Sequence, residues 1–449
     1  MTRRIRLNAF DMNCVGHIQH GLWTHPRDRS AEYTDLRYWT SLARTLERGL
    51  FDGLFLADVV GVYDVFGGTP DAALRHAVQI PVNDPMLLVS AMAVVTEHLG
   101  FGVTCNTTYE PPYLFARRMS TLDHLTRGRI GWNVVTGYLD SAARAMGLTG
   151  QPAHDDRYDA ADECMDLLYK LWEASWEDGA VLRDRARGVF TDPARVHAVR
   201  HGGRYAMEGI HLSEPSPQRT PVLYQAGAST RGREFAATHA ECVFVNGTSK
   251  STVAGLVADL RARAAANGRE ILVFVGATVV TGRTDAEARD KFEDYRAHAS
   301  AEAGLAHFSA GTGMDFAQFG MDEPMRHQKT EANQSNVEAV TKRSETAWTK
   351  RTLMDSMVLG SRQPPIVGSA ERVCDELRAW VEEADVDGFN LSRTVMPECV
   401  EDFVELVVPA LQERGMYKRG YDPGTLRDKL FGHPRLAPPH PAGIMRGGT

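Results

Sequence analysis

The sequence is poor in the features that mark secreted, membrane-spanning and nucleic-acid-binding proteins. Its six cysteines are scattered and form no C-x-x-C pair, which predicts reduced thiols and no zinc framework of paired cysteines. No run of about 18 apolar residues occurs, and the N-terminus lacks the apolar stretch of a signal peptide. The formal net charge of −8 disfavours nucleic acid and anionic membranes. We therefore expect a cytoplasmic protein with no nucleic-acid or membrane partner.

Two common active-site motifs are absent as well. The chain has no G-x-S-x-G nucleophile elbow, the strand-to-helix turn of serine hydrolases. It also has no G-x-G-x-x-G, so we expect no dinucleotide-binding Rossmann unit.

Eight strand-like apolar runs alternate with segments of helical periodicity. Leu36, Trp39, Leu42 and Leu46 are an example of the helical spacing. Eight strand–helix repeats are typical of a (β/α)₈ barrel, whereas an open doubly wound sheet requires a reversal of strand order midway. We predict one α/β domain over residues 1–449, a (β/α)₈ TIM barrel with insertions. The predicted strands are 5–10, 51–57, 99–106, 129–135, 221–226, 241–245, 270–280 and 387–391.

The chain of 449 residues is much longer than the roughly 250 residues of a typical barrel. The surplus predicts insertions, the largest at about 281–365 between the seventh and eighth strands. Shorter insertions are expected at 11–34, 58–84 and 140–220. The tail from about residue 421 is rich in proline and glycine, and we expect it to lie on the surface or to fray.

Polar side chains follow the predicted strands at the barrel end where active sites lie. Asp58 follows the second strand, Thr104 and Asn106 end the third, and Asn133 and Thr136 belong to the fourth. A buried hydroxyl or amide needs a hydrogen-bond partner. These side chains therefore either contact a polar ligand or form hydrogen bonds with one another.

The stretch PVLYQAGASTRGREF predicts a buried strand that turns at Gly227 into a helix capped by Ser229 or Thr230. Arg231 and Arg233 fall in the first turn, where the helix dipole favours an anion such as a phosphate. The same residues also fit an ordinary capped helix with two solvated arginines.

A second helix start lies in AHDDRYDAADE, with Asp155 or Asp156 as the expected N-cap. His154 and Tyr158 flank it, and both could donate hydrogen bonds to an anion. Alternatively, His154 is an exposed loop residue and Tyr158 belongs to the apolar stripe of the helix.

Three histidines, His17, His20 and His25, follow the first strand closely. One interpretation is a metal site in a hydrolase, because histidines after the first strand of a barrel can bind zinc. Their spacing matches no strong motif, so solvated histidines or a loop that folds over a ligand are the alternatives.

Several blocks together resemble the flavin-dependent monooxygenases related to bacterial luciferase. The resemblance is to the branch of nitrilotriacetate, dibenzothiophene-sulfone and dimethyl-sulfide monooxygenases, and it runs from about residue 5 to residue 430. The blocks are RTLERGLFDGLFLAD, AVVTEHLGFGVT, YEPPYLFARRMSTLDHLTRGRIGWNVVT, HDDRYDAADECMDLLYKLWE, VLYQAGASTRGREFAA and ADVDGFNL.

This resemblance implies a luciferase-like barrel that binds reduced FMN (FMNH₂) supplied by a separate NAD(P)H:flavin reductase. Asp58 and Thr104 match flavin-contacting positions, while His154, Tyr158 and Ser229 match positions at the FMN phosphate end. The cofactor implies oxidation of a small organosulfur or amine compound by O₂ through a flavin C4a-peroxide.

Within the family, solvent exclusion requires a lid, and the 281–365 insertion is the candidate. One of the three histidines after the first strand could hold the peroxide, but no catalytic residue is assigned. A homodimer or homotetramer is expected. The alternatives are a metal-dependent TIM-barrel hydrolase using His17, His20 and His25, and a flavin-binding protein without catalysis.

Overall fold

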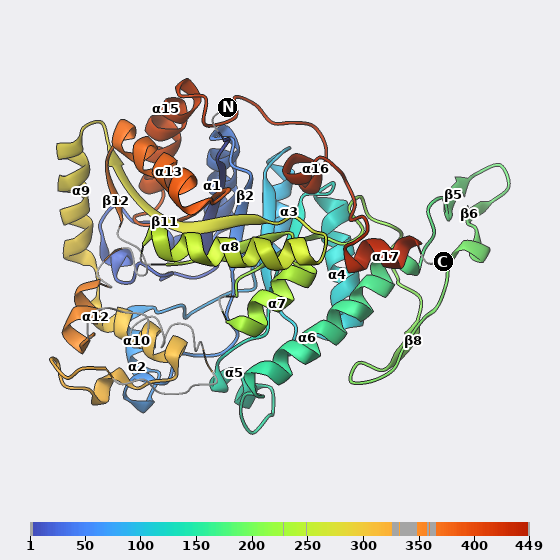
Figure 1. Ribbon diagram of the computed structural model, residues 1–449, viewed down its shortest axis with the longest axis horizontal. Helices are drawn as coiled ribbons and strands as arrows, with labels where there is room; N and C mark the ends of the chain where they lie inside the picture. Colours follow the sequence, from blue (N-terminus) through green and yellow to red (C-terminus); the bar gives the residue numbers. More distant parts are fainter. Residues whose placement is uncertain are drawn as a thin grey trace.

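Eight parallel strands close into a barrel at the centre of the molecule (Figure 1). The computed structural model describes residues 3–227, 229–247, 249–325, 332, 348–356, 359 and 365–447. Each predicted strand is present, with ends shifted by one or two residues in most cases. In barrel order they are β1 (Arg6–Met12), β2 (Gly53–Ala57), β3 (Gly100–Asn106), β4 (Ile130–Val135), β9 (Val222–Gln225), β10 (Cys242–Val245), β11 (Leu272–Gly282) and β13 (Gly388–Ser392), which pairs back to β1.

The strands are mostly apolar because both of their faces are buried. Alternate side chains point inward, and Phe10, Phe55, Tyr224 and Phe274 form a cluster inside the barrel. Their neighbours, such as Leu54, point outward and pack under the helices. Side chains that alternate along a strand therefore enter either the barrel interior or the layer under the helices. Both places are apolar, so the strand sequences read as nearly continuous apolar runs.

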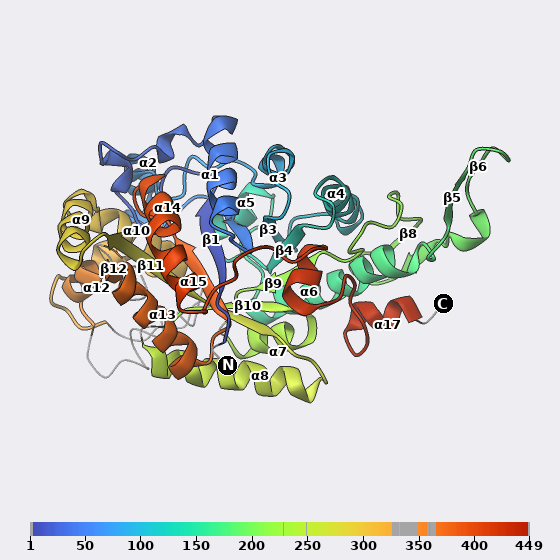
Figure 2. The same cartoon turned by 90° about the horizontal axis from the view of Figure 1, so that it is seen from above.

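Helices cover the outside of the barrel, and Figure 2 shows α3 and α4 on one side of the strands and α7 and α8 on the opposite side. In α1 the Asp35 side chain caps the helix, and the residues predicted to face inward include Trp39 and Leu42, both buried. The covering helices are α1 (Leu36–Arg48), α3 (Met86–Val94), α4 (Pro112–Leu125), α6 (His154–Tyr169), α7 (Thr230–His239), α8 (Lys250–Ala266), α13 (Ala370–Ala384), α14 (Glu398–Asp402) and α15 (Val408–Glu413).

The predicted insertions carry their own elements. Two hairpins extend to one side of the barrel (Figure 1). They are β5 (Val181–Asp184) with β6 (Val189–Thr191), and β7 (Val199–His201) with β8 (Met207–Gly209). The other insertion helices are α2 (Asp71–His76), α5 (Asp140–Ala145), α9 (Asp285–His298), α10 (Ala301–Thr312) and α12 (Lys350–Ser356).

Part of the predicted lid, 281–365, is outside the described residues, namely 326–331, 333–347, 357–358 and 360–364. Strand β12 (Ile366–Ser369), which follows it, was not predicted. It pairs in parallel with the end of β11, from Val279 opposite Ile366 onward. Only four residues form it, too few for a periodic pattern to stand out.

The C-terminal tail closes the barrel instead of fraying, which corrects the prediction. Leu426 and Leu430 of α16 (Leu426–Phe431) join the cluster inside the barrel. Arg427 is fully buried and bonds both carboxylate oxygens of Glu241, at 2.7 and 2.9 Å. The last helix, α17 (Pro441–Gly447), packs against α6.

Within the described residues, no helix combines the length and the apolar character needed to cross a bilayer. All six cysteines are free.

Candidate active site

Three predicted site residues, His154, Tyr158 and Ser229, meet at the start of α7. The Ser229 hydroxyl caps this helix by accepting the Gly232 N–H at 3.0 Å, as predicted. Nε2 of His154 lies 3.3 Å from the same hydroxyl. The His154 and Tyr158 rings are in contact, with centroids 5.1 Å apart. The ends of two helices far apart in sequence are therefore joined here.

The Tyr158 and Ser229 side chains approach Gly232 closely. A Cβ at this position would lie 2.8 Å from the Tyr158 hydroxyl and 3.0 Å from the Ser229 hydroxyl. The Gln225 amide nitrogen lies 3.5 Å from the Tyr158 hydroxyl, and its buried oxygen has no hydrogen-bond partner among the described residues. Hydroxyl, imidazole, amide and helix N–H groups thus gather at one polar spot, a combination suited to an anion.

Arg231 and Arg233 are paired with carboxylates, an arrangement that neither of the two open interpretations, a nearby anion or two solvated arginines, included. Arg231 is bound by two carboxylates of α6, Asp159 at 2.9 Å and Asp162. Arg233 pairs with Asp259 of α8 at 3.0 Å. A positive charge near the start of α7 is repelled by the helix dipole. The carboxylates of α6 and α8 compensate for this repulsion.

Helix α6 starts two or three residues earlier than predicted. Its first residue is His154, and the N-cap Ala153 has no capping side chain. Asp155 pairs with Nδ1 of His154 at 2.7 Å, which draws its carboxylate away from the helix end. The predicted aspartate N-cap is therefore wrong, and the two aspartates occupy the first turn.

Asp58 and Thr104 lie at different depths of the barrel. Thr104 is buried on β3 and accepts a hydrogen bond from the Asn133 side chain at 2.9 Å. Asp58 lines a cavity at the carboxyl ends of the strands. Burial, with Asp84 nearby, raises the pKa of Asp58 to about 7. Near neutral pH this acid therefore exists partly in its uncharged form.

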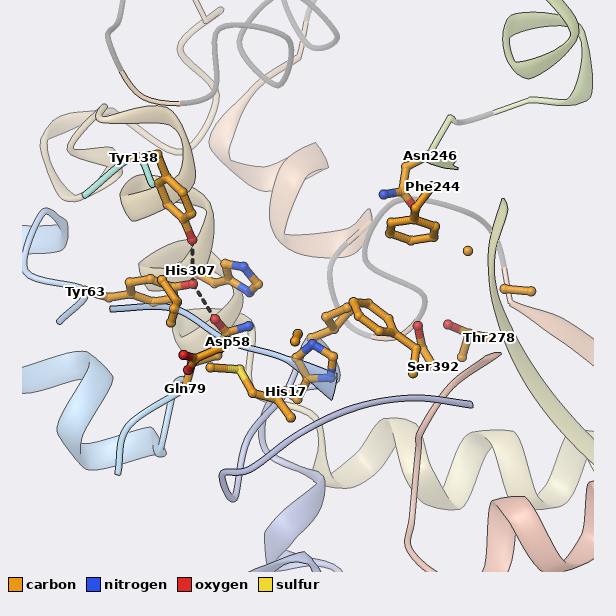
Figure 3. Close-up of a pocket in the computed structure, with 17 residues that line it drawn as sticks. His17, Asp58, Tyr63, Gln79, Tyr138, Phe244, Asn246, Thr278, His307 and Ser392 are labelled. Carbon is orange, nitrogen blue, oxygen red and sulfur yellow. Dashed lines mark hydrogen bonds between the residues drawn. The ribbon is translucent and has the colours of Figure 1, made fainter. Parts of the chain in front are cut away.

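The cavity has a volume of about 170 Å³ and a mixed lining (Figure 3). Tyr63, Tyr138 and His307 form one side, and Phe244 and Asn246 lie across from them. The complete lining is Phe10, Met12, His17, Ile18, Ala57, Asp58, Val59, Tyr63, Gln79, Tyr138, Phe244, Asn246, Gly276, Ala277, Thr278, His307 and Ser392.

A directed hydrogen-bond chain runs along one wall. The Tyr63 hydroxyl donates to the side-chain oxygen of Gln79, and the two tyrosine hydroxyls lie 2.8 Å apart. Because Tyr63 uses its proton on Gln79, Tyr138 is the donor to Tyr63. Gln79 adopts a left-handed backbone with φ of 53°, unusual for a non-glycine residue, and its N–H bonds the Gly16 carbonyl.

The three histidines after β1 separate rather than converge. His17 lines the cavity, His20 pairs with His307 behind it, and His25 lies against Asp294 and His298 of α9. Across the described residues, the one group suited to hold a metal ion is the last of these. A metal site built from all three predicted histidines is therefore not formed.

Hydrogen bonding also makes the His25 group a poor metal site. The Arg27 N–H donates to Nδ1 of His25 at 3.2 Å, so the neutral ring carries its proton on Nε2. That nitrogen lies 3.0 Å from an Asp294 oxygen, and the Arg27 guanidinium binds the same oxygen at 3.0 Å. The lone pair needed to ligate a metal is not available there.

The geometry agrees with what comparison with known proteins finds. The model of the luciferase-like monooxygenase family matches residues 17–388. The chain belongs to this family. The luciferase-like monooxygenases are flavin-dependent, so the predicted enzyme class and barrel type are confirmed, and the hydrolase alternative is set aside.

Two relatives of this luciferase-like monooxygenase are about equally similar to it. The dimethyl-sulfide monooxygenase of Hyphomicrobium sulfonivorans is 50% identical over 99% of this chain and 94% of its own length. The long-chain alkane monooxygenase of Geobacillus thermodenitrificans is 51% identical over 96% of this chain and 95% of its own. The crystal structure of a long-chain alkane monooxygenase (LadA) superposes with a TM-score of 0.92 at 50% identity, covering 99% of this chain and all of that one.

Four residues of this luciferase-like monooxygenase that line the cavity were missed by the sequence reasoning. Tyr63 and Gln79 come from the 58–84 insertion and His307 from the 281–365 insertion, whereas Tyr138 lies in the short stretch between β4 and the 140–220 insertion. None is part of a motif or follows a strand directly. Only a signal for contacts between distant segments could have identified them.

Proposed function

We propose that this enzyme is a two-component monooxygenase that uses FMNH₂ and O₂ to oxidise a small organosulfur or amine compound. The observation that carries the proposal is the polar spot at the start of α7, on the same barrel end as the cavity. FMN has a phosphate and a ring system, and these two places suit one each. Bound reduced flavin activates O₂ and supplies the oxygen atom.

Ser229, Tyr158 and His154 are proposed to hold the FMN phosphate. The N–H groups and dipole at the start of α7 favour an anion, and the Tyr158 hydroxyl is a donor beside them. Burial raises the pKa of Tyr158, so its hydroxyl keeps its proton. A solved relative, riboflavin lyase (RcaE), 38% identical to this chain, is described with a modified FMN and riboflavin.

Asp58 and Thr104 are proposed to contact the flavin ring system. An uncharged Asp58 at the cavity wall can donate a hydrogen bond to a flavin heteroatom. The wall of Tyr63, Tyr138 and Gln79 faces the remaining space, where we place the substrate and O₂. Helix α10, one of the described parts of the proposed lid, contributes His307 to the lining of that space.

A dialkyl sulfide is the substrate we favour. The cavity of about 170 Å³ must also hold the flavin ring, so little of it is left for a substrate, and one wall is lined with hydroxyl, amide and imidazole groups. A long alkane needs an extended apolar channel. It remains the second candidate because the alkane-oxidising relative is as similar to this chain as the sulfide-oxidising one.

The test is a coupled assay with FMN, NADH and a purified flavin reductase, with the product identified by mass spectrometry. Dimethyl sulfide, a sulfone, a tertiary amine and hexadecane form the substrate panel, and catalase removes free peroxide. We expect substrate-dependent product from one of the first three compounds. Failure to bind FMN or FMNH₂ at high micromolar concentration would overturn the proposed function, and product from hexadecane alone would overturn the substrate assignment.

We propose that a separate flavin reductase supplies the reduced flavin and that the enzyme assembles into a homodimer or homotetramer. Leu87 and Val94 lie two turns apart on α3 and are 77% and 87% exposed, which is unusual for large apolar side chains. A second copy covering this face would bury them. Light scattering after size-exclusion chromatography should give a dimer or tetramer, and Leu87→Glu combined with Val94→Glu should shift it toward the monomer.

A further inference from the structure

His20 and His307 form a hydrogen-bonded pair at the edge of the cavity. Nε2 of His20 lies 2.8 Å from Nδ1 of His307, and the ring centroids are 5.0 Å apart. His307 lines the cavity, whereas His20 is buried behind it and is not among the lining residues. Any effect of His20 on a bound molecule must therefore pass through His307.

Backbone contacts hold the two histidines at this distance. The His20 carbonyl accepts the Ser300 N–H at 2.9 Å, immediately before α10, which carries His307. Gly21 has φ of +95°, and a Cβ there would lie 2.5 Å from the His298 carbonyl oxygen. Only glycine fits where these two segments touch, so the pairing is built into the chain path.

The other nitrogen of His20 decides the direction of the hydrogen bond. Within the part of the chain that the structure describes, Nδ1 of His20 is buried and makes no hydrogen bond. A buried N–H without an acceptor is rarer than a buried acceptor without a donor. The favoured ring therefore carries its proton on Nε2 and donates it to Nδ1 of His307.

The surroundings of His20 oppose a second proton on its ring. Burial, followed by the positive charges of Arg393 and His76, lowers the pKa of His20 to about 3. Arg393 is itself fixed by a buried ion pair with Asp11 at 2.9 Å. His20 is thus a neutral donor throughout the pH range in which enzymes of this kind are assayed.

Among the described residues, the surroundings of His307 include an aromatic ring, an ion pair and the titratable groups of the cavity. Tyr63 stacks on its ring, with centroids 5.3 Å apart. Glu302, five residues earlier on α10, is bound to His76 at 3.0 Å. The other titratable groups that line the cavity are His17, Asp58 and Tyr138.

We propose that His20 is a positioning residue that keeps His307 uncharged and its proton on Nε2. A second proton on His307 would have to enter at Nδ1, where it would face the N–H of His20. His307 then presents an N–H donor, not a base, to a molecule in the cavity. The proton positions stand independently of the proposed function, and only their role in the reaction rests on it.

The direct test is NMR of the whole enzyme labelled with ¹⁵N in its histidine rings, recorded from pH 5.5 to 8. The His307 signals are identified by their loss in His307→Gln. We expect Nε2 to be protonated and Nδ1 unprotonated across this range. A proton on Nδ1, or a second proton gained near pH 6.5, overturns the proposal without any variant of His20.

Three variants give a kinetic test. His20→Phe removes the donor, so His307 should titrate like an ordinary histidine, and kcat at pH 6 should fall to about a quarter of its value at pH 8. His20→Gln keeps an N–H donor and should retain the wild-type profile, as should the distant control His124→Phe. An unchanged profile in folded His20→Phe overturns the proposal. Absence of turnover in every protein overturns the proposed function instead, and the NMR result still decides the proton positions.

Discussion

Gly232→Ala offers the sharpest test of where the phosphate binds. The added methyl group would lie 2.8 Å from the Tyr158 hydroxyl, 3.0 Å from the Ser229 hydroxyl and 3.3 Å from the Gly227 Cα. Real Cβ contacts are almost never this short, so one hydroxyl must move. Both are groups that we propose contact the phosphate.

The expected loss follows from the energy of one hydrogen bond to a charged group. Such a bond contributes about 1.5–3 kcal/mol, so losing one weakens FMN binding by about 10- to 150-fold. Gly255→Ala is a matched control, because Gly255 is also helical and a Cβ there has no neighbour within 4 Å among the described residues. This control should leave affinity unchanged and stabilise α8 by up to about 1 kcal/mol.

The assay is quenching of flavin fluorescence, with FMN and riboflavin titrated in parallel. Riboflavin lacks the phosphate, so the wild type should prefer FMN, and Gly232→Ala should lose most of that preference. The reasoning is refuted if folded Gly232→Ala distinguishes FMN from riboflavin as well as the wild type does. The phosphate would then bind elsewhere on the barrel.

Three further predictions concern charge. Arg427→Ala should lower the free energy of unfolding by about 3–5 kcal/mol in urea titration, because Glu241 would be left buried without its partner, whereas exposed Arg419→Ala should change it by less than about 0.5 kcal/mol. Asp58 binds its proton more tightly in the folded protein than in the unfolded chain, so its contribution to the free energy of unfolding falls as pH rises from about 4 to about 7. Asp58→Asn should remove this decline, which is checked by comparing unfolding free energies at pH 5 and pH 7.5. Arg231→Ala should leave FMN affinity within about twofold of the wild type, since carboxylates of α6 already hold this arginine; a tenfold loss would restore it to the phosphate site.

The barrel was predictable because each of its strands is buried on both faces. A run such as PVLYQA has no polar residue to break it except one amide, and the glycine that follows marks its end. Strand β12 was not predicted, because it is only four residues long and lies next to residues with no periodic pattern. The tail was misjudged because proline and glycine dominate its composition, while Leu426 and Leu430 carry the packing.

The candidate site was predicted only where it borders strand ends or helix starts. Ser229 and Tyr158 have local signals, a cap and a helix stripe, and the structure brings them together. Gln79 and His307 have none, since they reach the cavity through contacts between insertions. The pairing of Arg231 with carboxylates was not predicted, because its acidic partners are about 70 residues away and no local pattern reveals them.

The helix that seals the amino-terminal end of the barrel, α16, leaves the opposite rim as the route to the reactive space. Under the proposed function, cofactor, substrate and product would all enter and leave by that rim. The order of arrival becomes part of selectivity, because whichever molecule enters first restricts what can follow. Redesign for bulkier compounds should accordingly widen the rim loops and leave the last 25 or so residues intact.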